Sequence, residues 1–112
     1  MAVAIDATRT ESIRTDTSDP YTFNYTPTST PRGIVVCIIH SDNSTDYVVG
    51  VTYGGIPLFR AVTAADTATE QGRAYIYWRG DSIPPSTQTV SIDLTTGTAD
   101  DMQIVVFGLT GN

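Results

Sequence analysis

Hydrophobic and polar residues alternate along much of the chain, and the clearest alternation precedes a pair of glycines. Residues 47–53 place Tyr or Val at every second position, which is the two-residue period of a β-strand. Gly54 and Gly55 follow, and such a pair predicts a tight hairpin turn because glycine readily adopts positive φ. The return strand begins at Ile56. Pro57 cannot donate a ladder hydrogen bond, so we expect it at a sheet edge or beside the turn.

Similar patterns predict strands on both sides of this hairpin. Ile34–His40 is a continuous apolar run, which is typical of a central strand covered on both faces, and Met102–Leu109 is nearly so. The other predicted strands are Val3–Ala7, Tyr21–Tyr25, Arg73–Arg79 and Thr89–Thr95. Turn-forming residues between them predict loops at 26–33, 41–46, 63–72 (or one helical turn), 80–86 and 96–101.

The number and spacing of these elements define the fold class. About eight short strands with turn signals between them predict an all-β protein, a single antiparallel β-sandwich domain over residues 1–112. No stretch shows the 3.6-residue apolar spacing of an amphipathic helix. The polar N-terminal segment, residues 1–19, is expected to form either an edge strand or an extended arm that reaches a neighbouring molecule.

The charge balance narrows the choice of partners. The net charge is −6, and all six basic residues are arginines. An acidic chain lacks the positive surface that nucleic acid requires and is repelled by anionic lipid, so neither is expected as a partner. Residues 1–10 show no signal-peptide pattern, and no run approaches the ~18 apolar residues of a membrane span. Cys37 is the single cysteine, and its place in an apolar strand predicts a buried, unreactive thiol.

Candidate catalytic residues are few. His40 is the only histidine, and it precedes Ser41 and Asp42. Consecutive strand residues point to opposite faces, so these three do not form a catalytic relay. Asp100 and Asp101 lie in a predicted turn, where carboxylates are solvated rather than tuned for acid–base work. We therefore expect no catalytic residue and no enzyme.

Two loops carry weaker signals. Residues 42–46 offer five oxygen ligands that would suit a hard cation such as calcium, but they lack the spacing of an EF-hand, and turn formation explains them. The chain has no Cys/His cluster, so we expect neither a metal site nor a cofactor. Residues 79–81 read Arg-Gly-Asp, the tripeptide that integrins bind, although a glycine after a strand is also an ordinary turn residue.

One strand face is the strongest candidate for an interface. It carries Arg73, Tyr75, Tyr77 and Arg79. Tyrosine and arginine are enriched in protein interfaces, so this face is predicted to bind another protein. Two alternatives stay open: the tyrosines face the core while Ala74, Ile76 and Trp78 face outward, or they form a flat platform that stacks on sugar rings.

The order of motifs resembles a recurrent small β-sandwich domain, Ig-like or jelly-roll, of phage virion proteins. The resemblance rests on a Thr-Pro to Pro-Arg-Gly loop before an apolar strand (26–37) and a Val-Thr-Tyr-Gly-Gly segment (48–58). An aromatic Tyr-x-Tyr strand (75–77), a Pro-x-x-Thr-Gln-Thr-Val segment (85–92) and a final apolar strand ending in glycine (104–108) follow. It spans residues 5–108, and its motifs are turn and core signals.

The resemblance implies a structural role. Such domains decorate phage capsids or tails, which implies a capsid decoration (cement) protein that binds and stabilises the assembled shell. Its partners would be the major capsid protein or other virion proteins and further copies of itself. It would be located in the virion and become extracellular after host lysis. The alternative is an adhesive or carbohydrate-binding module of a tail fibre or bacterial surface protein, with Tyr75, Tyr77 and Trp78 as a glycan platform.

Overall fold

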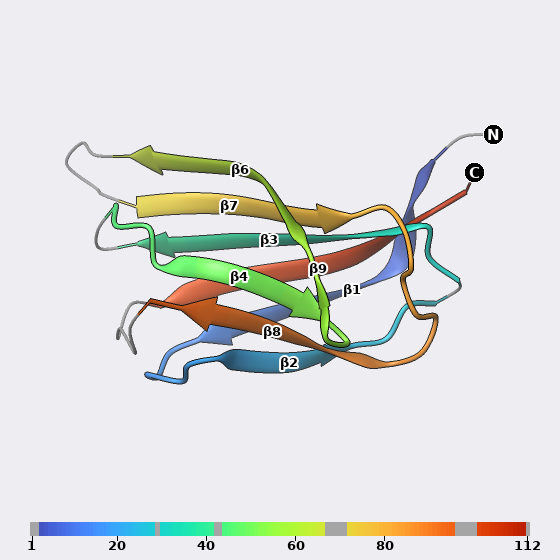
Figure 1. The fold of residues 1–112 in the computed structure, drawn as a ribbon, viewed down its shortest axis with the longest axis horizontal. Helices are drawn as coiled ribbons and strands as arrows, with labels where there is room; N and C mark the ends of the chain where they lie inside the picture. The colour runs from blue at the N-terminus through green and yellow to red at the C-terminus, as the bar shows by residue number, and fades with distance from the viewer. Residues whose placement is uncertain (1–2, 29, 42–43, 67–71, 96–100, 112) are drawn as a thin grey trace.

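The computed structural model describes residues 3–28, 30–41, 44–66, 72–95 and 101–111. This part of the chain forms strands and no helix, as predicted (Figure 1). The strands are β1 (Ala4–Arg14), β2 (Tyr21–Tyr25), β3 (Gly33–Ser41), β4 (Val48–Tyr53), β5 (Ile56–Pro57), β6 (Phe59–Asp66), β7 (Gly72–Arg79), β8 (Gln88–Leu94) and β9 (Met102–Thr110).

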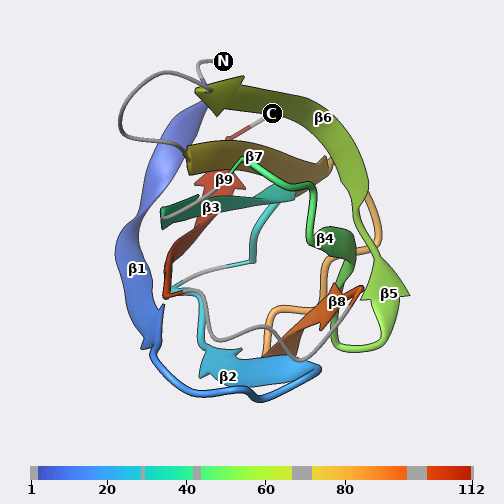
Figure 2. The same ribbon diagram turned by 90° about the vertical axis from the view of Figure 1, so that its left-hand side faces the viewer.

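The strands form two antiparallel sheets that pack face to face. One sheet has five strands in the order β1-β9-β3-β7-β6, and the other has four in the order β2-β8-β4-β5. Figure 2, seen along the long axis, shows β5 and β6 running along one side from the second sheet to the first. The predicted antiparallel β-sandwich is therefore confirmed.

The strand order is that of a long hairpin rolled into two layers. Counting outward from the glycine turn, β4 pairs with β5, β3 with β7, β2 with β8 and β1 with β9. Successive pairs alternate between the two sheets, which is the arrangement of a jelly roll. An Ig-like sandwich, with one A-B-E-D sheet and one C-F-G sheet, has a different order.

The tip of this hairpin is the predicted glycine turn. Gly54 and Gly55 have φ values of +59° and +79°, and Tyr53 lies opposite Ile56. Both φ values lie in the left-handed region, which glycine enters without the steric cost that other residues meet. Immediately after Pro57 the chain leaves β4 and joins β7, so the return strand contributes to both sheets.

The core lies between the sheets and consists of alternate residues from most of the strands. The buried apolar residues of the hydrogen-bonded strands are Tyr25, Ile34, Val36, Ile38, Val48, Val51, Tyr53, Tyr75, Tyr77, Val90, Ile92, Leu94, Met102, Ile104 and Val106. Four tyrosines enter this core, and their hydroxyl groups need buried hydrogen-bond partners.

Two strands are longer than the pattern predicts. β1 continues to Arg14 because Arg9–Arg14 pair with β9 after a register shift that follows Ile5, so this polar part of residues 1–19 is an edge strand rather than a detached arm. β6 continues to Asp66, where a loop or helical turn is predicted, because it pairs with β7. The parts of the predicted loops at 42–43, 67–71 and 96–100 lie outside the described residues.

The prediction that β3 is covered on both faces is wrong. β3 is the middle strand of its sheet, but only its inner face, with Ile34, Val36 and Ile38, is fully buried. On its outer face Ile39 is 57 % exposed. A continuous apolar run therefore reflects two different surroundings, a core on one side and an uncovered apolar face on the other.

Candidate functional site

The four residues predicted to form an interface lie on the inner face of β7: Arg73, Tyr75, Tyr77 and Arg79. Tyr75 and Tyr77 are 1 % and 3 % exposed, whereas Ile76 and Trp78 between and beside them are 38 % and 44 % exposed. The prediction of an exposed interface is wrong for the two tyrosines, because they lie between the sheets, out of reach of a protein or a sugar. The alternative that places the tyrosines in the core is the observed one.

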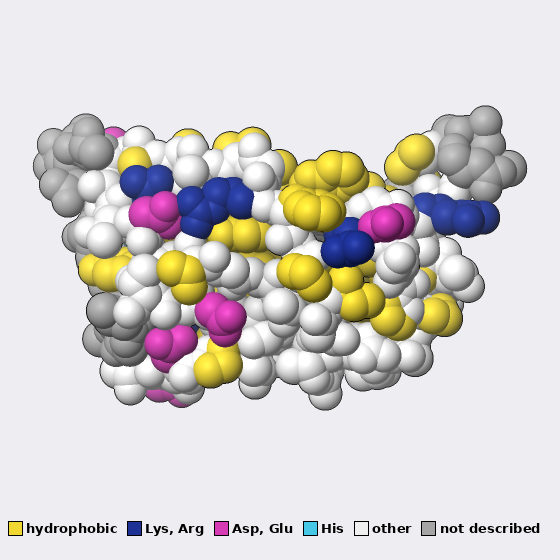
Figure 3. Space-filling view, viewed as in Figure 1, with side chains coloured by type: hydrophobic (Ala, Val, Ile, Leu, Met, Phe, Trp, Pro, Cys, Tyr) yellow, Lys and Arg dark blue, Asp and Glu magenta, His cyan; other side chains and the backbone are white. Residues whose placement is uncertain are grey.

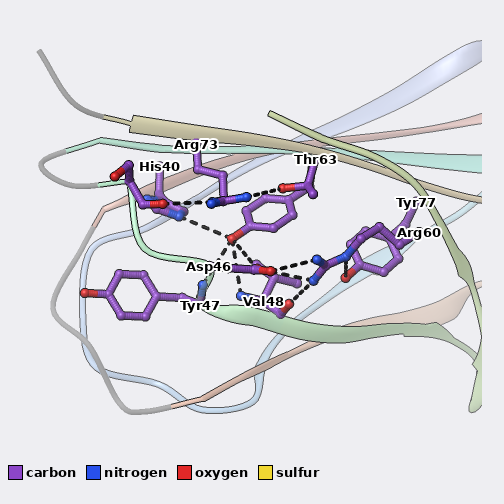
Figure 4. A network of polar contacts seen from close by, with 10 residues as sticks. His40, Asp46, Tyr47, Val48, Arg60, Thr63, Arg73 and Tyr77 are labelled. Atoms are coloured by element: carbon purple, nitrogen blue, oxygen red, sulfur yellow. Dashed lines mark hydrogen bonds and ion pairs between the residues drawn. The ribbon is translucent and has the colours of Figure 1, made fainter. Parts of the chain in front are cut away.

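The Tyr75 hydroxyl is the centre of a polar cluster between the sheets. It donates a hydrogen bond to Asp46 Oδ1 at 2.9 Å and accepts one from the Tyr47 N–H at 3.1 Å. The Val48 N–H and His40 Nε2 lie at 3.5 and 3.4 Å (Figure 4). These contacts connect β7 to β3 and to the segment that leads into β4.

Arg60, on β6, closes the other side of this Tyr75 cluster. Its guanidinium donates to both Asp46 carboxylate oxygens, at 2.8 and 3.3 Å, to Tyr77 Oη at 2.9 Å and to the Val48 carbonyl (Figure 4). It also lies 5.3 Å from the centre of the Tyr75 ring and 5.6 Å from that of Tyr77, which is cation–π geometry. Arg60 therefore fixes the positions of the two tyrosine rings and of the Asp46 carboxylate relative to one another.

The protonation states in the cluster follow from these contacts. The hydrogen bond from Arg60 lowers the pKa of Asp46 below its ordinary value of 3.8. Burial raises the pKa of Tyr75 to about 12. At neutral pH the carboxylate is ionised and the phenol is neutral. A phenol titrating so far from neutrality is poorly matched to general acid–base work, so the cluster is suited to joining the sheets.

Arg73 and Arg79 each donate hydrogen bonds that hold neighbouring segments, and the Arg79 guanidinium lies 5.4 Å from the centre of the Phe59 ring. Arg73 donates to the Ser44 carbonyl at 2.9 Å and to Thr63 Oγ1 at 2.8 Å. Arg79 donates to Asp81 Oδ1 and to the Pro57 carbonyl, each at 2.9 Å. The Arg-Gly-Asp tripeptide is thus folded on itself, with its two charged groups paired to each other rather than displayed together.

The other predicted sites separate in the structure. His40 is 1 % exposed and faces inward, whereas Ser41 is exposed. Asp42 and Asn43 of the oxygen-rich loop lie outside the described residues, as does Asp100. Among the described residues, no three His, Cys, Asp or Glu side chains lie close enough to hold a metal ion.

The feature that sequence reasoning missed is the outer face of the five-stranded sheet. Cross-strand register places its outward residues in three rows. From β1 to β6 the rows read Ile13, Gln103, Ile39, Ala74, Ala64; then Glu11, Val105, Cys37, Ile76, Val62; then Arg9, Phe107, Val35, Trp78, Phe59. Of the nine positions on β9, β3 and β7, eight are apolar and one is glutamine, and none is charged.

The second sheet provides an internal comparison. The outward positions of its β2 and β8 strands are Thr22, Asn24, Thr89, Ser91 and Asp93. That surface shows the polar outer side expected of an antiparallel sheet that faces water. The contrast holds for β2 and β8, whereas β4 of the same sheet exposes one valine, Val49, at 60 %. Figure 3 shows hydrophobic side chains also gathered near the bend where the chain passes from β5 to β6.

Cys37 lies at the centre of this outer face, on the middle strand and in the middle row. Its exposure is intermediate, and partial burial raises the pKa of its thiol. The predicted burial of this thiol is therefore only partial, since it faces outward among apolar neighbours. A signal for the face was present in the sequence, because β3, β7 and β9 each place apolar residues on both sides.

No protein-family model, curated protein or solved structure matches this chain. Within the described residues, no helix is both long and apolar enough to cross a membrane. The class that the geometry itself defines is a jelly-roll β-sandwich whose five-stranded sheet has an apolar outer face.

Proposed function

We propose that this protein is a structural virion protein of a tailed bacteriophage, a capsid decoration protein that binds and stabilises the assembled shell. The observation that carries the proposal is the apolar outer face of the five-stranded sheet. Ile39, Ile76 and Trp78 are 57 %, 38 % and 44 % exposed there. An exposed apolar area that is contiguous and rimmed by polar residues marks a contact surface.

The mechanism is assembly by burial of this outer face. Many copies occupy equivalent positions in a symmetric shell, and each buries apolar area against its neighbours in the assembly. The shell offers positions for these copies only once it has assembled, so binding shifts the equilibrium toward the assembled state. The Tyr75 cluster contributes by keeping the two sheets, and hence the outer face, in a fixed geometry.

The partners and location follow from the same proposal. They are the major capsid protein, other virion proteins and further copies of this chain, in a virion that is released when the host lyses. The net charge of −6 makes nucleic acid and anionic membranes poor partners. The proposal assigns no catalytic role, and the pairing of Asp46 with Arg60 and Tyr75 supports this.

Co-sedimentation with empty capsid shells of the phage that carries the gene tests the proposal. The wild-type chain is expected to pellet with shells in a fixed ratio and to raise the temperature at which they dissociate. Ile76→Glu, at the centre of the outer face, is expected to weaken this binding, whereas Ser91→Glu, on the polar face of the other sheet, leaves it unchanged. A wild-type chain that stays in the supernatant would refute the proposal.

A carbohydrate-binding role in a tail fibre or surface protein is the second candidate. Tyr75 and Tyr77 no longer support it, but Trp78 is 44 % exposed and lies opposite Phe59, which is 55 % exposed. Such a pair could stack on a sugar ring. Binding to a glycan array that is lost in Trp78→Ala, together with no binding to shells, would favour this role.

A further inference from the structure

We infer that the outer face of the five-stranded sheet packs against the same face of a second copy of this chain, forming a twofold dimer. The inference rests on the proposed function, because it names the first partner of the assembly surface. A sheet face that packs on another sheet is ordinary β-sandwich chemistry, and it places the two backbones about 10 Å apart.

The available area matches what a dimer needs. Ile13, Ile39, Phe59, Val62, Ile76 and Trp78 are between 38 % and 61 % exposed, and their neighbours on β3 and β9 are partly exposed. Large side chains exposed to this degree contribute roughly 100 Å² each, so the face offers on the order of 700 Å². A specific interface of standard size buries about 800 Å² on each partner.

The pattern of side-chain sizes fits a second copy in reversed orientation. One end of the face is aromatic, with Trp78 and Phe59, and the other end is small, with Ala74 and Ala64 on the same two strands. A copy turned end for end about an axis across the strands places the aromatic end of each chain over the alanine end of the other. On these two strands the contact is self-complementary, as twofold symmetry requires.

The charge of this face is compatible with a second copy at this position. Two chains that each carry a net charge of −6 repel one another unless the contact surface itself is uncharged. The charged residues in the three rows are Arg9 and Glu11 at the β1 edge, which have opposite signs and lie 3.5 Å apart. The centre of the contact therefore brings no like charges together. Glu11 lies in the middle row and meets its own copy only at the exposed β1 edge, beside Arg9.

Light scattering of the purified full-length chain over a range of concentrations is the first test. We expect the mass to double from 12.0 kDa. Ile76→Glu places two carboxylates near the axis and is expected to raise the dissociation constant at least about 100-fold, because an unpaired buried charge is strongly unfavourable. Ser91→Glu adds the same charge to the other sheet and is expected to remain dimeric.

Cys37 provides a second test. It lies at the centre of the face, so a central twofold axis brings the two thiols together across the interface. Sheets about 10 Å apart are too distant for a disulfide, which requires Cα atoms within roughly 7 Å, and the interface buries both thiols. We therefore expect a monofunctional maleimide to label the wild-type chain more slowly as the chain concentration rises, with no such change in labelling rate for Ile76→Glu.

The outcomes of these experiments test the twofold dimer and the capsid role separately. A wild-type chain that is monomeric at all concentrations, or a dimer that Ile76→Glu leaves intact and whose Cys37 is labelled at the same rate at every concentration, overturns the twofold dimer. A monomer that still binds shells overturns the dimer alone. A dimer that ignores shells overturns the capsid role and leaves the dimer standing.

Discussion

Removing one oxygen atom from the core tests whether the Tyr75 cluster holds the two sheets together. Tyr75→Phe keeps the ring in the core, so it creates no large cavity. It deletes the hydroxyl that bonds to Asp46 at 2.9 Å and receives the Tyr47 N–H at 3.1 Å. It also leaves the buried Val48 N–H without this neighbour at 3.5 Å.

The size of the effect depends on which of these groups water can reach. The Asp46 side chain is 41 % exposed, so water replaces its lost bond at little cost. The amides of Tyr47 and Val48 lie deeper, and a buried donor that loses its acceptor costs about 1–3 kcal/mol. We expect Tyr75→Phe to lower the free energy of unfolding by about 2 kcal/mol, or the Tm by roughly 8 °C.

Tyr21→Phe is the matched control. Its hydroxyl bonds to Ser12 Oγ at 2.5 Å and to the Ile13 carbonyl at 3.2 Å, near the surface, where water can take over both contacts. We expect a loss below about 1 kcal/mol. Urea denaturation at one fixed chain concentration measures both variants. Equal losses in the two, or no loss in Tyr75→Phe, would refute the assignment of the cluster as a link between the sheets.

Three further predictions follow from described contacts. The pKa of Asp46 is lowered in the folded chain, so the ionised carboxylate stabilises the fold at pH values above 3.8, the ordinary pKa of the group. This stabilisation is lost as the pH falls through the folded pKa. The urea midpoint of Asp46→Asn should therefore vary less between about pH 5 and 2 than that of the wild type. Gly72→Ala would place a Cβ 2.9 Å from the His40 carbonyl and should destabilise the chain by about 1–3 kcal/mol. A Cβ at Gly50 meets nothing within 4 Å, so Gly50→Ala should change stability by under about 0.5 kcal/mol. Equal urea midpoints for the two variants would contradict this. Ile38 and Ile39 are 0 % and 57 % exposed. In the monomeric background of Ile76→Glu, Ile38→Ala should lower the free energy of unfolding by about 3 kcal/mol and Ile39→Ala by less than about 1 kcal/mol. The reverse order would refute the assignment of faces.

The strands and the central turn could be predicted from the sequence because each has a local physical cause. The Gly54–Gly55 turn depends only on the conformational freedom of glycine, and the strand Tyr21–Tyr25 is marked by aromatic residues at every second position. The extension of β1 to Arg14 could not be found in this way. Its polar residues form a strand because β9, which is about 90 residues later, supplies the ladder.

The candidate site was harder to predict because alternation does not say which face is inside. On β7 both faces carry large apolar or aromatic residues, and Tyr75 and Tyr77 are accepted in the core by partners from β6 and from the segment before β4. Tyr75 meets Asp46, 29 residues away, and this pairing has no local signal. The apolar outer face is likewise visible only after register aligns Cys37, Ile76 and Val105 across three strands.

The position of β9 has a consequence for how the chain acquires its structure during synthesis. β9 lies between β1 and β3, so the last of these nine strands to be synthesised is the one that joins the first of them to the rest of its sheet (Figure 1). Until then β1 has no ladder partner, and one edge of β3 is open. Pairings between such distant segments form slowly, so the nascent chain exposes unpaired edges for longer than a helical protein of this size would. Chaperone dependence during translation is the expected consequence of this strand order.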